Sequence, residues 1–178
     1  MRVALWTAAV LLLAIPLIAM QYTDEVNWTL SDFAFAMIMI GGVGGAYELA
    51  LRLKPNWAYR AGVAMALAAA FLLIWINAAV GIIGDEGNPW NLMFAGAILV
   101  AVAGSVIARF RAAGMVWAMV AAALTQCLAG AVAIVGGLGE PVTGALELAG
   151  LVGFFGVLWL NAAWLFRRAA NAARKPRK

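Results

Sequence analysis

Six long apolar runs, separated by short polar turns, make up most of this chain of 178 residues. A helix needs about 20 apolar residues to cross the hydrocarbon core of a bilayer. On that basis the runs predict six spans, at residues 3–20, 29–53, 57–83, 91–108, 115–135 and 142–166. Long continuous runs favour helices over a β-barrel, whose strands alternate in polarity. We therefore expect an all-α integral membrane protein with a single transmembrane domain over residues 1–178.

The first run has a second interpretation as a cleavable signal peptide, with Arg2 as its basic start. However, the run is long for a signal core, and Leu17-Ile18-Ala19 does not offer the small-x-small pattern of a good cleavage site. We interpret it as a retained span, which Pro16 bends near its outer end.

An acidic turn precedes the second and fourth runs, and the two copies align at a constant offset. The matching pairs are Asp24/Asp85, Glu25/Glu86, Asn27/Asn88, Phe33/Phe94, Ala34/Ala95 and Ala36/Ala97. A fainter third copy begins at Glu140. The pattern predicts three consecutive hairpins with an internal pseudo-repeat, each of which turns through an acidic loop.

Composition excludes several classes of protein. Hydrophobic residues are 66% of the chain and charged residues 11%, whereas soluble domains carry about 25% charged residues. Histidine is absent and Cys127 is the single cysteine, so neither a disulfide framework nor a paired-cysteine metal site is expected. We predict no cofactor.

Basic and acidic residues occupy different turns of the chain. All twelve basic residues lie at residue 2, in 52–60, in 109–111 or in 167–178, and all the acids except Glu48 lie in or beside the other turns. Excess Lys and Arg in short loops marks the cytoplasmic face. This predicts a bacterial inner (plasma) membrane protein with both termini in the cytoplasm. Its basic tail, residues 167–178, would contact anionic lipid rather than nucleic acid.

The acidic turns have two interpretations. Asn88 with Pro89 is a good helix start, and Asn27 would cap the second span in the same way unless Thr29 and Asp32 form a capping box there. Alternatively, the turns converge and bind a hard cation through carboxylate oxygens. The residues of that candidate cation site are Asp24, Glu25, Asp85, Glu86 and Glu140.

Three polar residues form a candidate intramembrane site: Glu48, Asn77 and Gln126. Glu48 precedes Arg52 by four residues, which favours an ion pair at the inner end of the second span, with a cation or proton site as the alternative. Polar groups such as Asn77 and Gln126 usually hydrogen-bond across helices, although they would also serve to line a narrow polar path.

Glycines are frequent within the runs. Gly41 and Gly45 form a GxxxG pair, and Gly150, Gly153 and Gly156 mark a second small-residue face. Such faces let membrane helices approach closely, within one bundle or between proteins.

No nucleophile with a partner base is evident, and an enzyme is the least supported class. We expect an accessory or scaffolding subunit, or a self-associating bundle that forms a homo-oligomer or joins a larger membrane complex. The alternative is a small transporter or channel for a cation or small solute, with the acidic turns as its outer vestibule and Glu48 as an inner group.

Overall fold

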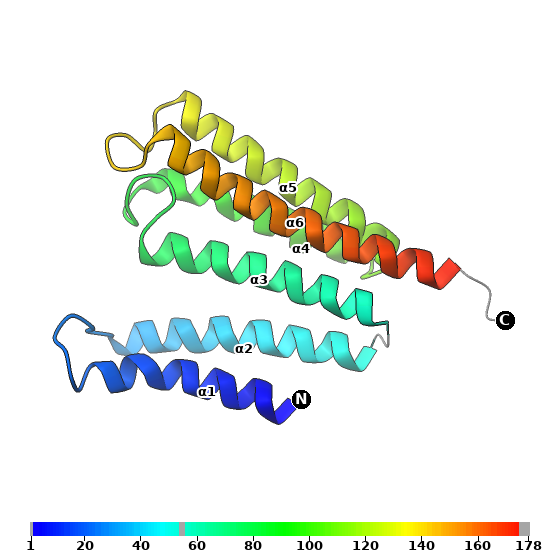
Figure 1. Ribbon diagram of the computed structural model, residues 1–178, viewed down its shortest axis with the longest axis horizontal. Coiled ribbons are helices and arrows are strands. Elements are labelled where there is room, and N and C mark those ends of the chain that lie inside the picture. The colour runs from blue at the N-terminus through cyan, green and yellow to red at the C-terminus, as the bar shows by residue number, and fades with distance from the viewer. Residues whose placement is uncertain (1, 54–55, 175–178) are drawn as a thin grey trace. The chain divides into compact units, whose positions relative to one another are not determined.

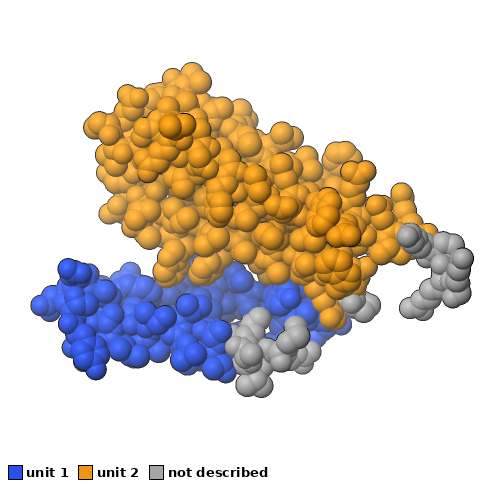
Figure 2. Space-filling view, in the orientation of Figure 1, with its two compact units in different colours: residues 1–53 blue, residues 54–178 orange. Residues whose placement is uncertain are grey.

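A computed structural model describes residues 2–53 and 56–174 of the chain. Its secondary structure over these residues is entirely helical. The chain divides into two compact units, residues 1–53 and residues 54–178 (Figure 2).

The first unit consists of α1 (Arg2–Ala19) and α2 (Leu30–Leu53), which lie side by side and are joined by a turn (Figure 1). The start of α2 is a capping box, in which the Thr29 backbone N–H donates to Asp32 Oδ2 at 2.7 Å. Trp28 packs edge-on against Phe33, with ring centroids 5.1 Å apart, as a hydrophobic staple. The prediction that Asn27 caps this helix is therefore wrong, and the Thr29–Asp32 alternative is confirmed.

The second unit contains α3 (Trp57–Ala79), the 3-10 helix η1 (Pro89–Phe94), α4 (Ala95–Ile107), α5 (Ala112–Val135) and α6 (Ala145–Arg174). In this unit α5 packs against both α4 and α6, and α3 packs against α6 (Figure 1). Large side chains fill the space between the helices, with Trp159 and Phe166 toward one end and Phe94 and Phe155 toward the other.

Small residues set the close approach of these helices, as lipid-embedded packing requires. A Cβ atom added at Gly104 would lie 2.8 Å from the Ala118 Cβ, so α4 and α5 touch at that point. An added Cβ at Gly130 of α5 would overlap the Val152 side chain of α6. The glycines of α4 and α5 therefore belong to the internal packing of the unit.

The helix bounds differ from the predicted spans at several ends, and three of these differences change the picture. The third helix ends at Ala79 rather than at residue 83, because the chain turns through Gly81 and Gly84, whose φ angles are +75° and +71°. The fourth span begins as η1 and becomes α-helical only at Ala95. The sixth helix continues to Arg174, so residues 167–174 of the predicted tail are helical, and residues 175–178 lie outside the described range.

Five helical stretches of the described residues are long and apolar enough to cross a membrane: Leu30–Arg52, Trp57–Ala79, Pro89–Ile107, Ala112–Val135 and Ala145–Arg174. The first helix contributes a shorter apolar stretch, Trp6–Ala19, and its role as a sixth span stays a prediction. This is a multi-pass membrane protein.

The contact between Gly130 and Val152 predicts a specific loss of stability. In the Gly130→Ala variant the new methyl group meets Val152, so we expect a loss of about 1–3 kcal/mol in the free energy of unfolding. The matched control is Gly153→Ala in α6, where an added Cβ meets no atom within 4 Å. The free energy of unfolding of that control should lie within about 1 kcal/mol of the wild-type value, because alanine has a higher helix propensity than glycine. Unfolding in detergent by increasing sodium dodecyl sulfate measures both, and equal losses would contradict the packing described.

Candidate functional site

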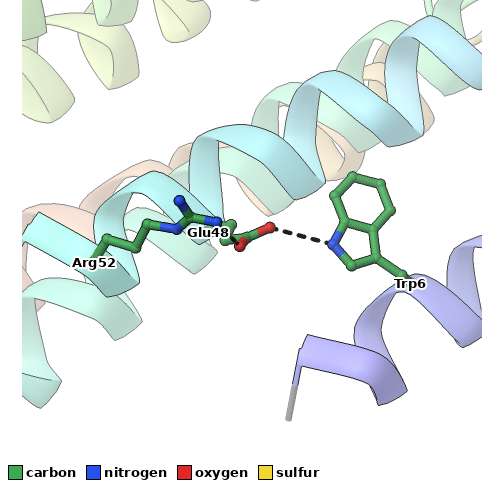
Figure 3. Close-up of polar contacts among 3 residues, drawn as sticks. All are labelled: Trp6, Glu48 and Arg52. Atoms are coloured by element: carbon green, nitrogen blue, oxygen red, sulfur yellow. Dashed lines mark hydrogen bonds and ion pairs between the residues drawn. The ribbon is translucent and has the colours of Figure 1, made fainter.

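Glu48 is the acid that lies away from the acidic turns, and both of its carboxylate oxygens have partners (Figure 3). Oε1 accepts a hydrogen bond from the Arg52 guanidinium at 2.5 Å, one helical turn further along α2. Oε2 accepts a hydrogen bond from the Trp6 indole N–H of α1 at 3.2 Å. The side chain of Glu48 is 19% exposed and that of Arg52 is 59% exposed. The predicted ion pair is present.

Sequence reasoning did not find Trp6 as a partner of Glu48. The usable signal was the indole N–H, a donor that normally finds an acceptor when it leaves water. Because α1 and α2 are antiparallel, the start of α1 lies beside the end of α2 (Figure 1). Glu48 is the acidic residue in that last part of α2. The contact links the two helices of the first unit.

The contacts among Trp6, Glu48 and Arg52 favour a structural role, in which they anchor α1 to α2. One oxygen of Glu48 neutralises Arg52, and the other fixes the position of α1 relative to α2. The described residues contain no group of three or more His, Cys, Asp or Glu side chains that would hold a metal ion. Use of Glu48 as a cation or proton site stays a prediction.

Asn77 and Gln126 belong to the second unit, and no hydrogen bond joins them. Asn77 donates from Nδ2 to the Leu73 carbonyl of its own helix at 2.6 Å, and its Oδ1 is buried without a partner among the described residues. Gln126 in α5 is fully buried, and neither amide atom has a partner in the described part of the chain. Neither residue therefore makes the expected interhelical hydrogen bond within the described part of the chain.

The second and third acidic turns meet within the second unit. The backbone N–H of Gly84 donates to Thr143 Oγ1 at 3.2 Å, and that hydroxyl lies 3.3 Å from the Gly84 carbonyl. Asn88 Nδ2 donates to the Leu138 carbonyl at 3.1 Å. The same Asn88 accepts from the Trp90 N–H at 3.0 Å, so the predicted cap before Pro89 is confirmed.

Asn91 holds the first of these two turns in place, a role that the sequence did not reveal. Its Oδ1 accepts from the backbone N–H groups of Ile82 and Ile83 at 3.0 and 2.8 Å. Its Nδ2 donates to the carbonyls of Asp85 and Ile83 at 2.7 and 3.3 Å. One buried amide thus satisfies four backbone groups, which would otherwise be costly to bury.

The carboxylates of the candidate cation site stay on the surface. Asp24 and Glu25 are exposed in the turn of the first unit, and Asp85, Glu86 and Glu140 are exposed in the second. Neutral groups, those of Asn88, Asn91 and Thr143, carry the hydrogen bonds of the turns in the second unit. A cation bound by all three turns stays a prediction.

Comparison of the chain with models of protein families, with curated proteins and with solved structures found no match.

The contact between Trp6 and Glu48 predicts an energetic coupling between the first two helices. Trp6→Phe removes the hydrogen-bond donor and Glu48→Gln removes the negative charge. The double variant should therefore lose less stability than the sum of the losses in the two single variants. We expect a coupling of about 0.5–1.5 kcal/mol in the free energy of unfolding. The control cycle pairs Trp6→Phe with Asp32→Asn, whose carboxylate contacts Thr29 instead. Additive losses in both cycles would contradict the anchor.

Proposed function

We propose that this membrane protein is not an enzyme and acts through the surfaces of its helices. It serves as an accessory or scaffolding subunit, or as a self-associating bundle. One observation carries the proposal, namely that the glycine face of α2 is left open within the first unit. A Cβ added at Gly41, Gly42 or Gly45 would meet no atom within 4 Å. By contrast, Gly44 is buried, and Gly104 and Gly130 are in close contact with neighbouring helices.

An open glycine face is costly unless a partner covers it. Glycine weakens a helix relative to alanine by roughly 0.5–1 kcal/mol, and in lipid its advantage is the close approach of another backbone. Within the first unit, α1 leaves Gly41 and Gly45 uncovered. We infer that this GxxxG pair is the main docking element, either for a second copy of the chain or for another membrane protein.

The second predicted glycine face divides. Gly156 lies against α5, with an added Cβ 3.7 Å from Cys127 Sγ, whereas Gly150 and Gly153 would meet no atom within 4 Å. Only Gly150 and Gly153 are therefore available to a partner, as a secondary element beside the face of α2.

We also propose that the protein lies in the bacterial inner membrane with both termini in the cytoplasm, as three consecutive hairpins. The charges of the second unit support this orientation. Hydrogen bonds place the acidic turns at one end, and the bond from the Tyr59 hydroxyl to the Phe110 carbonyl places the start of α3 beside the α4–α5 turn at the other. The basic end carries Arg60, Arg109, Arg111, Arg167, Arg168 and Arg174.

A transporter or channel for a cation or small solute remains the second candidate, and Gln126 favours it. A fully buried amide without a protein partner is what a site for a small polar molecule would leave. Solute flux into liposomes that contain the purified chain separates the two candidates, because a scaffold would carry none.

Substitution of the open glycines should break the association. In a variant with both Gly41→Leu and Gly45→Leu, the side chains would hold a partner helix away, and we expect about a tenfold weaker association. Crosslinking in native membranes and the size of the particle in mild detergent measure it. The control is Ala131→Leu, a similar enlargement at an exposed position of α5.

Two results would contradict the proposal. One is a wild-type protein that is a monomer without crosslinks in several mild detergents. The other is an equal loss of association in the glycine variant and in the Ala131→Leu control, because the effect would then not be specific to α2.

A further inference from the structure

The basic end of the second unit holds an arginine between two exposed indole rings. The Arg168 guanidinium carbon lies 4.6 Å from the centroid of the Trp164 ring and 5.7 Å from that of Trp57. Trp164 is 52% exposed and Trp57 is 64% exposed. The rings come from the end of α6 and the start of α3, so the cluster joins two helices that are far apart in sequence.

A shallow groove begins at this cluster and follows α6. It has a volume of about 350 Å³ and is lined by Val157, Leu160, Asn161 and Trp164. With a rise of about 1.5 Å per residue, Leu160 lies about 12 Å and Val157 about 16 Å along the axis from Arg168. The groove thus runs from a cationic end toward the middle of the span, and its surface changes from polar to apolar on the way.

Within the described part of the second unit, no acidic side chain lies at this end to pair with Arg168. The four acids between residues 56 and 174 are Asp85, Glu86, Glu140 and Glu147, and all lie at or near the acidic turns. The ion pair among the described residues joins Glu48 and Arg52 of the first unit. Arg168 has no ion-pair partner among them. Its neighbours in the second unit are the two indole rings, whose faces attract the cation.

We propose that Arg168, Trp164 and Trp57, together with the groove on α6, form a binding site for one anionic phospholipid. The headgroup phosphate binds the Arg168 guanidinium, and one acyl chain lies along Leu160 and Val157. This inference goes beyond the proposed function and does not depend on it.

The chemistry of each part fits this ligand. A guanidinium stacked on an aromatic face keeps its in-plane N–H groups free for two parallel hydrogen bonds to a phosphate. Indole rings favour the level of the headgroups and the glycerol, where Trp164 would lie. The exposed Asn161 amide, one turn deeper, is placed to donate to an ester carbonyl. A free phosphate ion would use Arg168 alone and leave the groove without a role.

Native mass spectrometry of the full chain in detergent measures the binding of added phosphatidylglycerol against phosphatidylcholine. We expect Arg168→Gln to weaken the binding of phosphatidylglycerol about tenfold. The matched control is Arg167→Gln, the same charge change at the adjacent exposed arginine, which has no indole contact among the described residues. The control should stay within about twofold of the wild type, since it removes only general attraction.

Two further measurements identify the ligand. A Val157→Trp variant fills the exposed groove and should weaken binding of phosphatidylglycerol while it leaves the arginine in place. Inorganic phosphate at millimolar concentration should not displace the lipid. Equal weakening by both arginine variants, equal binding of the two lipids, or displacement by inorganic phosphate would each overturn the proposal.

Discussion

The absence of water within the bilayer is the constraint on which the rest of the structure depends. Each backbone N–H or C=O left unpaired in lipid costs several kcal/mol, so the backbone of each span forms a helix. The backbone groups that a helix leaves unpaired at its ends, and those buried in the adjoining turns, need other partners. In this chain those partners are short polar side chains at helix ends. Asn56 caps α3, Thr29 and Asp32 cap α2, and Asn91 satisfies four groups of the turn before η1.

The same solvent decides how the helices associate. Because lipid tails are as apolar as the side chains, the hydrophobic effect does not drive membrane helices together. They are held instead by close van der Waals packing and by hydrogen bonds between helices. The second unit uses Gly104 and Gly130 for contact, and the first uses the hydrogen bond from Trp6 to Glu48 as its link. Within the first unit Gly41 and Gly45 stay uncovered, and under the proposed function they are where a partner helix makes contact. Gln126 is the one fully buried side chain amide that the packing leaves unsatisfied in the described residues.

Sequence alone predicted what depends on local pattern. Apolar length placed most helix ends to within about four residues, but it ended the sixth helix at residue 166, whereas α6 continues to Arg174. The spacing of Thr29 to Asp32, Asn88 to Pro89 and Glu48 to Arg52 predicted two caps and an ion pair. It could not predict Trp6 beside Glu48, Thr143 beside Gly84, or the four bonds of Asn91, because these depend on how the chain returns on itself. The repeat also misled at Asn27, because the helix is capped by the box that begins two residues later, at Thr29.

Separation of charge between the two ends of the second unit underlies both the proposed orientation and the lipid site. Accessibility of single cysteines in intact cells tests it most directly, in a Cys127→Ser background. A membrane-impermeant maleimide should label Glu86→Cys and Glu140→Cys from outside, and should label Ala113→Cys, beside the α4–α5 turn, only after permeabilisation. Labelling of Ala113→Cys in intact cells, with Glu86→Cys and Glu140→Cys protected, would contradict the orientation and with it the assignment of the basic end to the cytoplasmic leaflet.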